Sequence, residues 1–197
     1  MAAAEGLFAE HGYESVSIRA INAAAGVNPA AVHYHFGSKE ALVAAILEER
    51  MDILDRWRRE RRHELAAAGI ALTPRHVVEL LVQPLLDLMR EEPDRGPTYV
   101  DLLTRLYLGR DPIIYQRGAV VGAWWRDVVD AALSDLPPQI RFLRWMITID
   151  SAFVALSRRL VREDTFAHPA LSWEAIASEL VDQLAMGLGG CRNGPPA

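Results

Sequence analysis

The amino-acid sequence predicts an all-α protein in two parts: an N-terminal helix-turn-helix domain of three helices over residues 1–47, and a C-terminal helical domain over residues 48–190. Residues 17–42 carry the caps and the glycine expected of two short helices joined by a tight turn. Beyond residue 38, apolar residues recur at helical spacing and do not alternate as in a strand. We expect the last residues, 191–197, to form a flexible tail.

The first helix of the turn unit is predicted to follow Ser17, whose hydroxyl can accept a free N–H group of the first turn. Its apolar side would consist of Ile18, Ile21 and Ala25. Gly26 ends this helix, because a sharp exit needs a left-handed backbone that glycine adopts at low cost. The sequence therefore predicts a short helix with a defined end.

The second helix is predicted to have Asn28 as its cap and Pro29 in its first position, where the missing N–H of proline costs nothing. A turn of about three or four residues then joins the two helices, as a helix-turn-helix unit requires. Ser38 begins a third helix. Lys39 in its first turn is unfavourable for the helix dipole but well placed for a bound phosphate.

The rest of the chain divides into further helices, several of which start at proline. A long helix is expected from residue 38 to about residue 68. Later helices are expected at residues 73–92, 97–109, 112–136, 138–162 and 172–187. The arginine-rich run at residues 56–64 has two interpretations: a solvated helix face with acid–base pairs, or a flank that contacts DNA phosphates.

Helix 138–162 has a narrow polar stripe and a broad apolar side, which predicts burial over most of its circumference. The stripe consists of Arg141, Arg144, Thr148, Ser151, Arg158 and Arg162. Asp150 lies in the middle of the apolar side, and a buried carboxylate needs a partner. Two roles for Asp150 stay open: an ion-pair partner in the core or dimer interface, or a ligand contact in a cavity.

Composition agrees with a globular protein. The chain has 197 residues, of which 51% are hydrophobic, which is enough for a sizeable core. It has no secretory signal, no apolar run of the ~20 residues that a membrane span needs, and one cysteine, so we expect a cytoplasmic protein. The formal net charge is −5, and residues 1–50 hold three basic and six acidic side chains. This balance disfavours sequence-independent binding to nucleic acid.

Nothing in the sequence indicates an enzyme. There is no nucleophile motif, no metal-ligand spacing and no glycine-rich phosphate loop. His33 and His35 are two residues apart on a helix, so they point to different faces and cannot share a metal. We therefore expect no catalytic residues, no cofactor and no metal.

Three motifs occur in order over residues 6–47: LFAEHGY, IRAINAAAGVN and VHYHFGSKEAL. Together they resemble the DNA-binding domain of the TetR family of bacterial regulators, and the last is similar to a subgroup with the pattern AAVxYHFGSKEAL. His33 stands where most relatives have tyrosine or asparagine, so base preference does not carry over. Only six residues precede Leu7, where relatives have ten or more. Three explanations stay open: a start codon assigned too late, a chain that was cut, or a short first helix.

The resemblance implies a ligand-responsive, sequence-specific transcriptional regulator: a repressor that a small apolar molecule releases from a palindromic operator. It implies a homodimer formed through helices 138–162 and 172–187. It also implies DNA contacts by a set of residues in the matching motifs. These are Ser17, Arg19, Asn28, Pro29, Ala30, Ala31, His33, Tyr34, His35 and Lys39.

An inducer cavity in the C-terminal domain follows from the same resemblance, with a fatty-acyl-like ligand as the weakly indicated class. Its predicted lining is Tyr99, Leu103, Tyr107, Trp124, Trp125, Met146, Asp150 and Phe153. The alternative, prompted by the acidic N-terminal domain, is a helical ligand-binding or interaction module that descends from such a regulator and no longer binds DNA.

Overall fold

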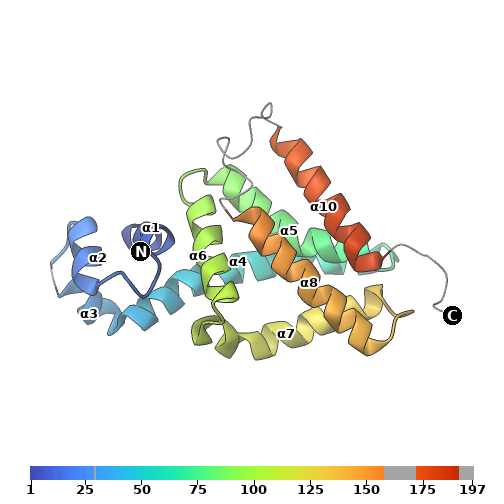
Figure 1. Cartoon of the computed structure of the whole chain (residues 1–197), viewed down its shortest axis with the longest axis horizontal. Coiled ribbons are helices and arrows are strands. Elements are labelled where there is room, and N and C mark those ends of the chain that lie inside the picture. Colours follow the sequence, from blue (N-terminus) through green and yellow to red (C-terminus); the bar gives the residue numbers. More distant parts are fainter. Residues whose placement is uncertain (29, 158–171, 191–197) are drawn as a thin grey trace.

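The computed structural model describes residues 1–28, 30–157 and 172–190, except for the side chains of residues 115–121. In these ranges every regular element is a helix, which confirms the predicted all-α class. The helices are α1 Ala2–His11, α2 Ile18–Ala24, α3 Ala31–Phe36, α4 Lys39–Ala67, α5 Pro74–Glu91, α6 Gly96–Leu108, α7 Pro112–Ala132, α8 Pro138–Leu156 and α10 Trp173–Gly189 (Figure 1). None of these helices is both long enough and apolar enough to cross a membrane.

Helix α4 connects the two parts of the molecule. Its 29 residues span about 43 Å, from α2 and α3 at one end to the larger group of helices at the other (Figure 1). Helix α5 is the centre of that larger group, because it contacts α4, α6, α7, α8 and α10. Helix α1 packs on α6, so the N-terminal helices touch the C-terminal group directly as well as through α4.

The arginine-rich run of α4 lies at the far end of that helix. Residues 56–64 follow Lys39 by about 26–38 Å of helix, so they lie far from α3 along α4. The expectation of a solvated face is right for Arg56, Arg59 and Arg61, which are exposed. It is wrong for Arg58, whose side chain is buried, with 6% of the residue exposed.

Arg58 is buried because α5 contains a proline. Pro84 has no N–H, so it leaves the carbonyl of Leu80, four residues earlier, without its helical hydrogen bond. Arg58 Nε donates to that carbonyl at 3.1 Å, and Arg58 Nη1 donates to Asp55 at 2.8 Å. The guanidinium also lies over the ring of Trp125, at 5.6 Å from the centroid. Burial lowers the pKa of Arg58, and the Asp55 carboxylate opposes that shift.

Helix α8 faces the core with a side that the sequence analysis assigned to solvent. Thr148 and Ala152 are buried, whereas Leu143, Ile147 and Val154 on the other side are exposed. The predicted burial of the broad apolar side is therefore wrong for the single chain. The inner side, which also includes Phe153 and Leu156, packs against neighbouring helices, and Leu143, Ile147 and Val154 are left on the surface.

The polar residues of α8 were also assigned incorrectly. Asp150 is exposed, so its predicted burial in the apolar side is wrong. Arg141 forms an ion pair with Asp130 of α7 at 2.8 Å, and Arg144 donates to the carbonyls of Leu188 and Gly189 at 3.2 and 2.6 Å. Arg141 thus links α8 to α7, and Arg144 links α8 to the end of α10. The predicted continuation over residues 158–162, with Arg158 and Arg162, lies outside the described residues.

Candidate DNA-binding surface and regulatory core

The first helix of the turn unit ends and begins nearly as predicted. Ser17 Oγ accepts the N–H of Ala20 at 3.1 Å, which confirms the predicted cap. Gly26 has φ +64°, which confirms the left-handed exit. Ala25 is exposed, so its predicted place on the apolar side is wrong. The reason is that α2 ends at Ala24, and Ala25 already belongs to the turn.

The second helix, α3, begins two residues later than predicted. The side-chain oxygen of Asn28 accepts the N–H of Ala30 at 2.9 Å, and its carbonyl accepts the N–H of Ala31 at 2.8 Å. Asn28 therefore forms a turn before α3, and Ala30 occupies the cap position. Pro29 lies outside the described residues.

A buried asparagine joins α2 to α3, and the sequence analysis gave it no role. Asn22 Oδ1 accepts the N–H of Val32 at 3.3 Å, and the Asn22 carbonyl accepts the N–H of Val27 in the turn at 3.0 Å. Both bonds fix the angle between the two helices. The sequence offers one indication of this role: Asn22 is a polar residue next to Ile21, and both lie on the side of α2 that packs inward.

The predicted DNA contacts that lie on the surface come from α2, the turn and α3. Ala31 and Lys39 are half-buried, and the other described members are exposed: Ser17, Arg19, Asn28, Ala30, His33, Tyr34 and His35. Tyr34 is 84% exposed, and its ring lies 5.1 Å from that of His35. Beneath them, Val32 is buried and Phe36 half-buried. Helix α3 thus presents aromatic and imidazole groups outward, with no acidic residue.

Lys39 does not have a free ammonium group. Its Nζ donates to the carbonyls of Tyr13, Glu14 and Val16, at 2.9, 3.3 and 3.2 Å, and lies 4.4 Å from the centre of the Tyr13 ring. An ammonium has three N–H donors, so these three carbonyls account for all of them. The predicted phosphate contact is therefore wrong as a description of this side chain. Lys39 instead ties the start of α4 to the loop after α1.

The neighbouring carboxylate strengthens the same junction. Tyr13 donates its hydroxyl hydrogen to Glu40 Oε1 at 2.9 Å. The pKa of the Glu40 carboxyl is lowered by its own backbone N–H at the start of α4 and by hydrogen bonds from Tyr13 and Ser38. Burial, helped by the Glu40 carboxylate, raises the pKa of Tyr13.

The residues predicted to line an inducer cavity fall into two aromatic groups. Trp125 stacks on Trp145 at 4.8 Å and meets Trp124 edge-on at 4.8 Å. Tyr107 and Phe153 form the second group, with ring centres 4.7 Å apart. Burial varies among the predicted members. Tyr99, Leu103, Trp125 and Phe153 are buried, Tyr107, Trp124 and Met146 half-buried, and Asp150 exposed.

Asp150 is joined to the second aromatic group. The hydroxyl of Tyr107 donates to Asp150 Oδ1 at 2.9 Å. Asp150 is exposed to solvent in the single chain, so its charge needs no further partner there.

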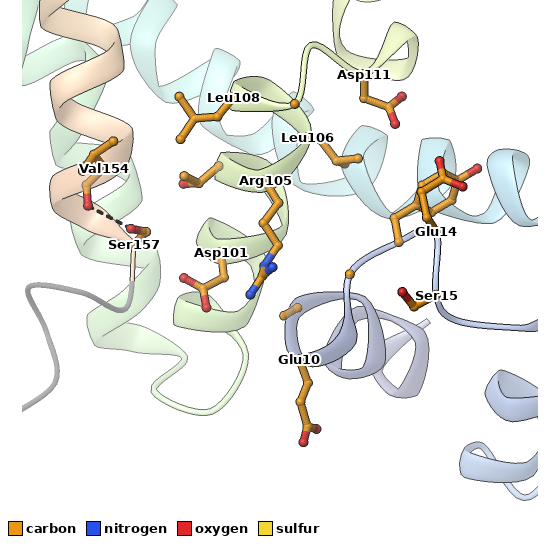
Figure 2. Close-up of a pocket in the computed structure, with 15 residues that line it drawn as sticks. Glu10, Glu14, Ser15, Asp101, Arg105, Leu106, Leu108, Asp111, Val154 and Ser157 are labelled. Atoms are coloured by element: carbon orange, nitrogen blue, oxygen red, sulfur yellow. Dashed lines mark hydrogen bonds between the residues drawn. The ribbon is translucent and has the colours of Figure 1, made fainter.

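A cleft of about 860 Å³ separates part of α1 from the C-terminal helices. Its walls come from the end of α1 and the loop after it, from α6, and from the end of α8 (Figure 2). Arg105 extends from α6 toward α1 in this cleft, and Glu10 and Glu14 lie on the other wall (Figure 2). None of the predicted cavity residues lines it. The sequence could not indicate it, because its walls are far apart along the chain.

Metal binding has no support in the described part of the chain. No three side chains of histidine, cysteine, aspartate or glutamate gather there in a way that could hold an ion.

The N-terminal part of the chain matches a known family over the same helices. Residues 1–46 match the family of bacterial regulatory proteins called the tetR family. Over these residues the chain is similar to this family. The match covers α1 to α3 and the first turns of α4, and it confirms the resemblance found in the sequence motifs.

Two transcriptional regulators are similar to parts of this chain. The transcriptional regulator UidR of Escherichia coli strain K12 is 33% identical over 101 residues, which are 51% of this chain and 46% of UidR. The transcriptional repressor AcnR of Corynebacterium efficiens is 45% identical over 42 residues, which are 21% of this chain and 22% of AcnR. The alignments thus cover about half, or less, of the length of these relatives.

Solved structures show the same fold over nearly the whole chain. The probable transcriptional regulatory protein RHA5900 has a TM-score of 0.62 and 24% identity, with 96% of each chain covered. The ketosteroid transcriptional regulator KstR2 of Mycobacterium tuberculosis has a TM-score of 0.62 and 20% identity, with 94% of this chain and 90% of that chain covered. These two regulators thus share the fold of this chain.

The contacts of Lys39 lead to a test that separates stability from DNA binding. We expect Lys39→Met to lower the free energy of unfolding by about 1–3 kcal/mol, because three backbone carbonyls lose a charged donor. Its DNA affinity should keep the parental salt dependence, measured as the slope of log Kd against log salt. Arg19→Ala, which removes an exposed arginine, should reduce that slope by about one phosphate contact. Parental stability with a reduced slope for Lys39→Met would contradict this assignment.

Proposed function

We propose that this chain is a sequence-specific, DNA-binding transcriptional regulator that acts as a repressor in the cytoplasm. The observation that carries the proposal is the outward face of α3, where His33, Tyr34 and His35 are exposed and no acidic residue occurs. The core residue Val32 and the buried Asn22 hold this face at a fixed angle to α2. A helix held in this way is suited to enter the major groove, with side chains directed to base edges.

The proposed assembly is a homodimer on a palindromic operator. Its interface would be formed by α8 and α10, where apolar side chains are exposed on the single chain. Two-fold symmetry would then place the two α3 helices in successive major grooves, about 34–36 Å apart. In this proposal each chain reads one half-site, through α3 and the exposed Ser17 and Arg19 of the preceding helix.

The proposed release mechanism uses a small apolar inducer in the C-terminal helices. The proposed contacts are the aromatic pair of half-buried Tyr107 and buried Phe153, together with half-buried Met146 of the same helix as Phe153. Asp150 at its edge disfavours a free carboxylate at that position, because two negative charges would repel. A neutral or esterified acyl compound is therefore favoured over a free fatty acid.

Titration of the full chain with its own upstream promoter DNA tests the function. We expect saturable binding that is stronger than binding to a scrambled duplex of the same length at both low and moderate salt. Absence of binding at low salt would favour the alternative, a ligand-binding or interaction module that has lost DNA binding. The family match does not favour that alternative.

Tyr34→Ala tests the placement of the recognition helix. We expect a loss of about 1–3 kcal/mol in operator binding, roughly 5- to 150-fold in Kd, with unchanged thermal stability because Tyr34 is exposed. His33→Ala should act in the same way at the neighbouring position. Ile70→Ala, an exposed apolar residue beyond the end of α4, is the control and should bind as the parent does. Parental binding by both α3 variants would show that α3 does not read DNA.

A further inference from the structure

We propose that Glu5 of α1 is a positioning residue that sets the orientation of the N-terminal helices relative to the C-terminal group. The inference rests on the proposed function, because orientation of these helices determines where α3 meets DNA. Its physical basis is a cluster of charges around the buried Glu5 and Arg50, near the contact between α1 and α6.

Glu5 is 1% exposed and binds a different arginine with each carboxylate oxygen. Its Oε1 lies 3.2 Å from Arg50 Nε, and its Oε2 accepts a hydrogen bond from Arg95 Nη2 at 3.0 Å. Arg50 lies within α4, and Arg95 immediately precedes α6. One side chain of α1 is therefore held at once by the connecting helix and by the start of α6.

The cluster contains two acidic and two basic side chains. Arg50 donates two further hydrogen bonds to Glu92, at 3.2 and 2.8 Å, so two carboxylates face two guanidinium groups. The hydrogen bond from Arg50 lowers the pKa of the Glu92 carboxyl. The Arg50 guanidinium also lies over the ring of the buried Tyr99 of α6, at 5.4 Å from the centroid. The charges are thus anchored to the rigid core of the C-terminal helices.

Apolar packing constrains only part of this junction. The 860 Å³ cleft opens between the end of α1 near Glu10 and the later part of α6, so that end of the contact is unfilled. Charge-assisted hydrogen bonds are directional, whereas apolar contacts permit sliding. Buried ion pairs contribute little net stability, and in some proteins they select one geometry. The Glu5 cluster has the position and the directionality to select one here.

Glu5→Gln is the informative variant, because it keeps the shape of the side chain and removes its charge. Arg50 keeps Glu92 as its partner, and Arg95 has solvent, with 44% of its side chain exposed. Glu10→Gln, at an exposed position of the same helix, is the matched control. Spin labels on Ala24→Cys in α2 and Ala131→Cys in α7, in a Cys191→Ser background, report the distance between the two parts of one chain. Dilution with unlabelled protein removes distances between chains.

We expect a narrow distance distribution for the parent and for Glu10→Gln, and a distribution broadened or shifted by several ångströms for Glu5→Gln. Thermal stability should change little, because Arg50 keeps Glu92 as its partner and Arg95 keeps contact with solvent. A residue with only a structural role would instead lower stability without broadening the distance distribution. A folded Glu5→Gln chain with the parental distribution overturns the proposal. If Glu5→Gln does not fold, Arg95→Gln replaces it, because this variant leaves the Glu5–Arg50 pair in place. Arg95→Gln must then broaden the distance distribution. A parental distribution for Arg95→Gln would overturn the proposal equally.

A second measurement connects the cluster to DNA. On operators with altered spacing between half-sites, Glu5→Gln should lose the parental preference for one spacing, while binding to a single half-site stays unchanged. A retained spacing preference would overturn the proposal. If the parent binds no DNA, the proposed function fails, whereas the distance measurement still decides whether Glu5 sets the orientation of the N-terminal helices.

Discussion

Replacing Ile147 with glutamate is expected to convert the protein to a monomer at micromolar concentration and to weaken operator binding by on the order of 10²-fold, as separation of two linked binding units does. Ile147 is 57% exposed at the centre of the apolar side of α8, between Leu143 and Val154. In an interface with two-fold symmetry each residue occurs twice, so one substitution places two carboxylates in the apolar contact. An unpaired charge buried there costs several kcal/mol.

Sedimentation velocity measures the first effect. The parent should sediment as a particle of twice 21.9 kDa, and Ile147→Glu as one of 21.9 kDa. Ile53→Glu is a closely matched control, because Ile53 is 58% exposed but lies on α4, away from α8 and α10. It should remain a dimer. A parent that sediments as a 21.9 kDa particle would contradict the proposed assembly, and a dimeric Ile147→Glu would place the interface elsewhere.

Arg58→Met is expected to lower the free energy of unfolding by about 2–4 kcal/mol, because it leaves the buried carbonyl of Leu80 without a hydrogen-bond donor. The methionine keeps part of the aliphatic volume, so the loss reports mainly the guanidinium contacts. These include the bond to Asp55 and the position over the Trp125 ring. Urea denaturation measures the change. Arg59→Met, at the exposed neighbouring position, should shift stability by less than about 0.5 kcal/mol.

Pro84→Ala provides the test of the physical reason. Alanine restores an N–H at position 84, which can bond the Leu80 carbonyl within α5. The cost of Arg58→Met should therefore be smaller in the Pro84→Ala background than in the parent. A double-mutant cycle measures this difference. An equal cost in both backgrounds would mean that Arg58 stabilises the fold through Trp125 and Asp55, and that the carbonyl of Leu80 contributes little.

The turn unit shows how far local signals reach. Ser17 and Gly26 act through hydrogen bonds and backbone angles within four residues, and the structure confirms both. Asn28 uses its side chain locally too, but it forms a turn and not the helix cap that was predicted. The two arrangements differ by one or two residues and use the same donor and acceptor types. Composition therefore does not distinguish them.

Lys39 shows where local signals stop. Its position at the start of α4 is equally suited to a phosphate and to the carbonyls of another segment. The carbonyls of Tyr13, Glu14 and Val16 lie 23 to 26 residues earlier in the chain, and only the tertiary fold brings them within reach of Lys39. The same holds for Glu5, whose partner Arg95 is 90 residues away.

The sequence by itself determined the helical class, the positions of most helix ends and the outward face of α3, because these depend on contacts within one or two turns of helix. The tertiary structure decided which side of α8 faces the core, which arginine of the run at residues 56–64 is buried, and which charged side chains form ion pairs between α1 and the start of α6. Helical periodicity places residues on a common face but carries no information about what covers that face. That choice depends on neighbours that are distant in the chain, as the buried Thr148 and the exposed Ile147 of α8 show.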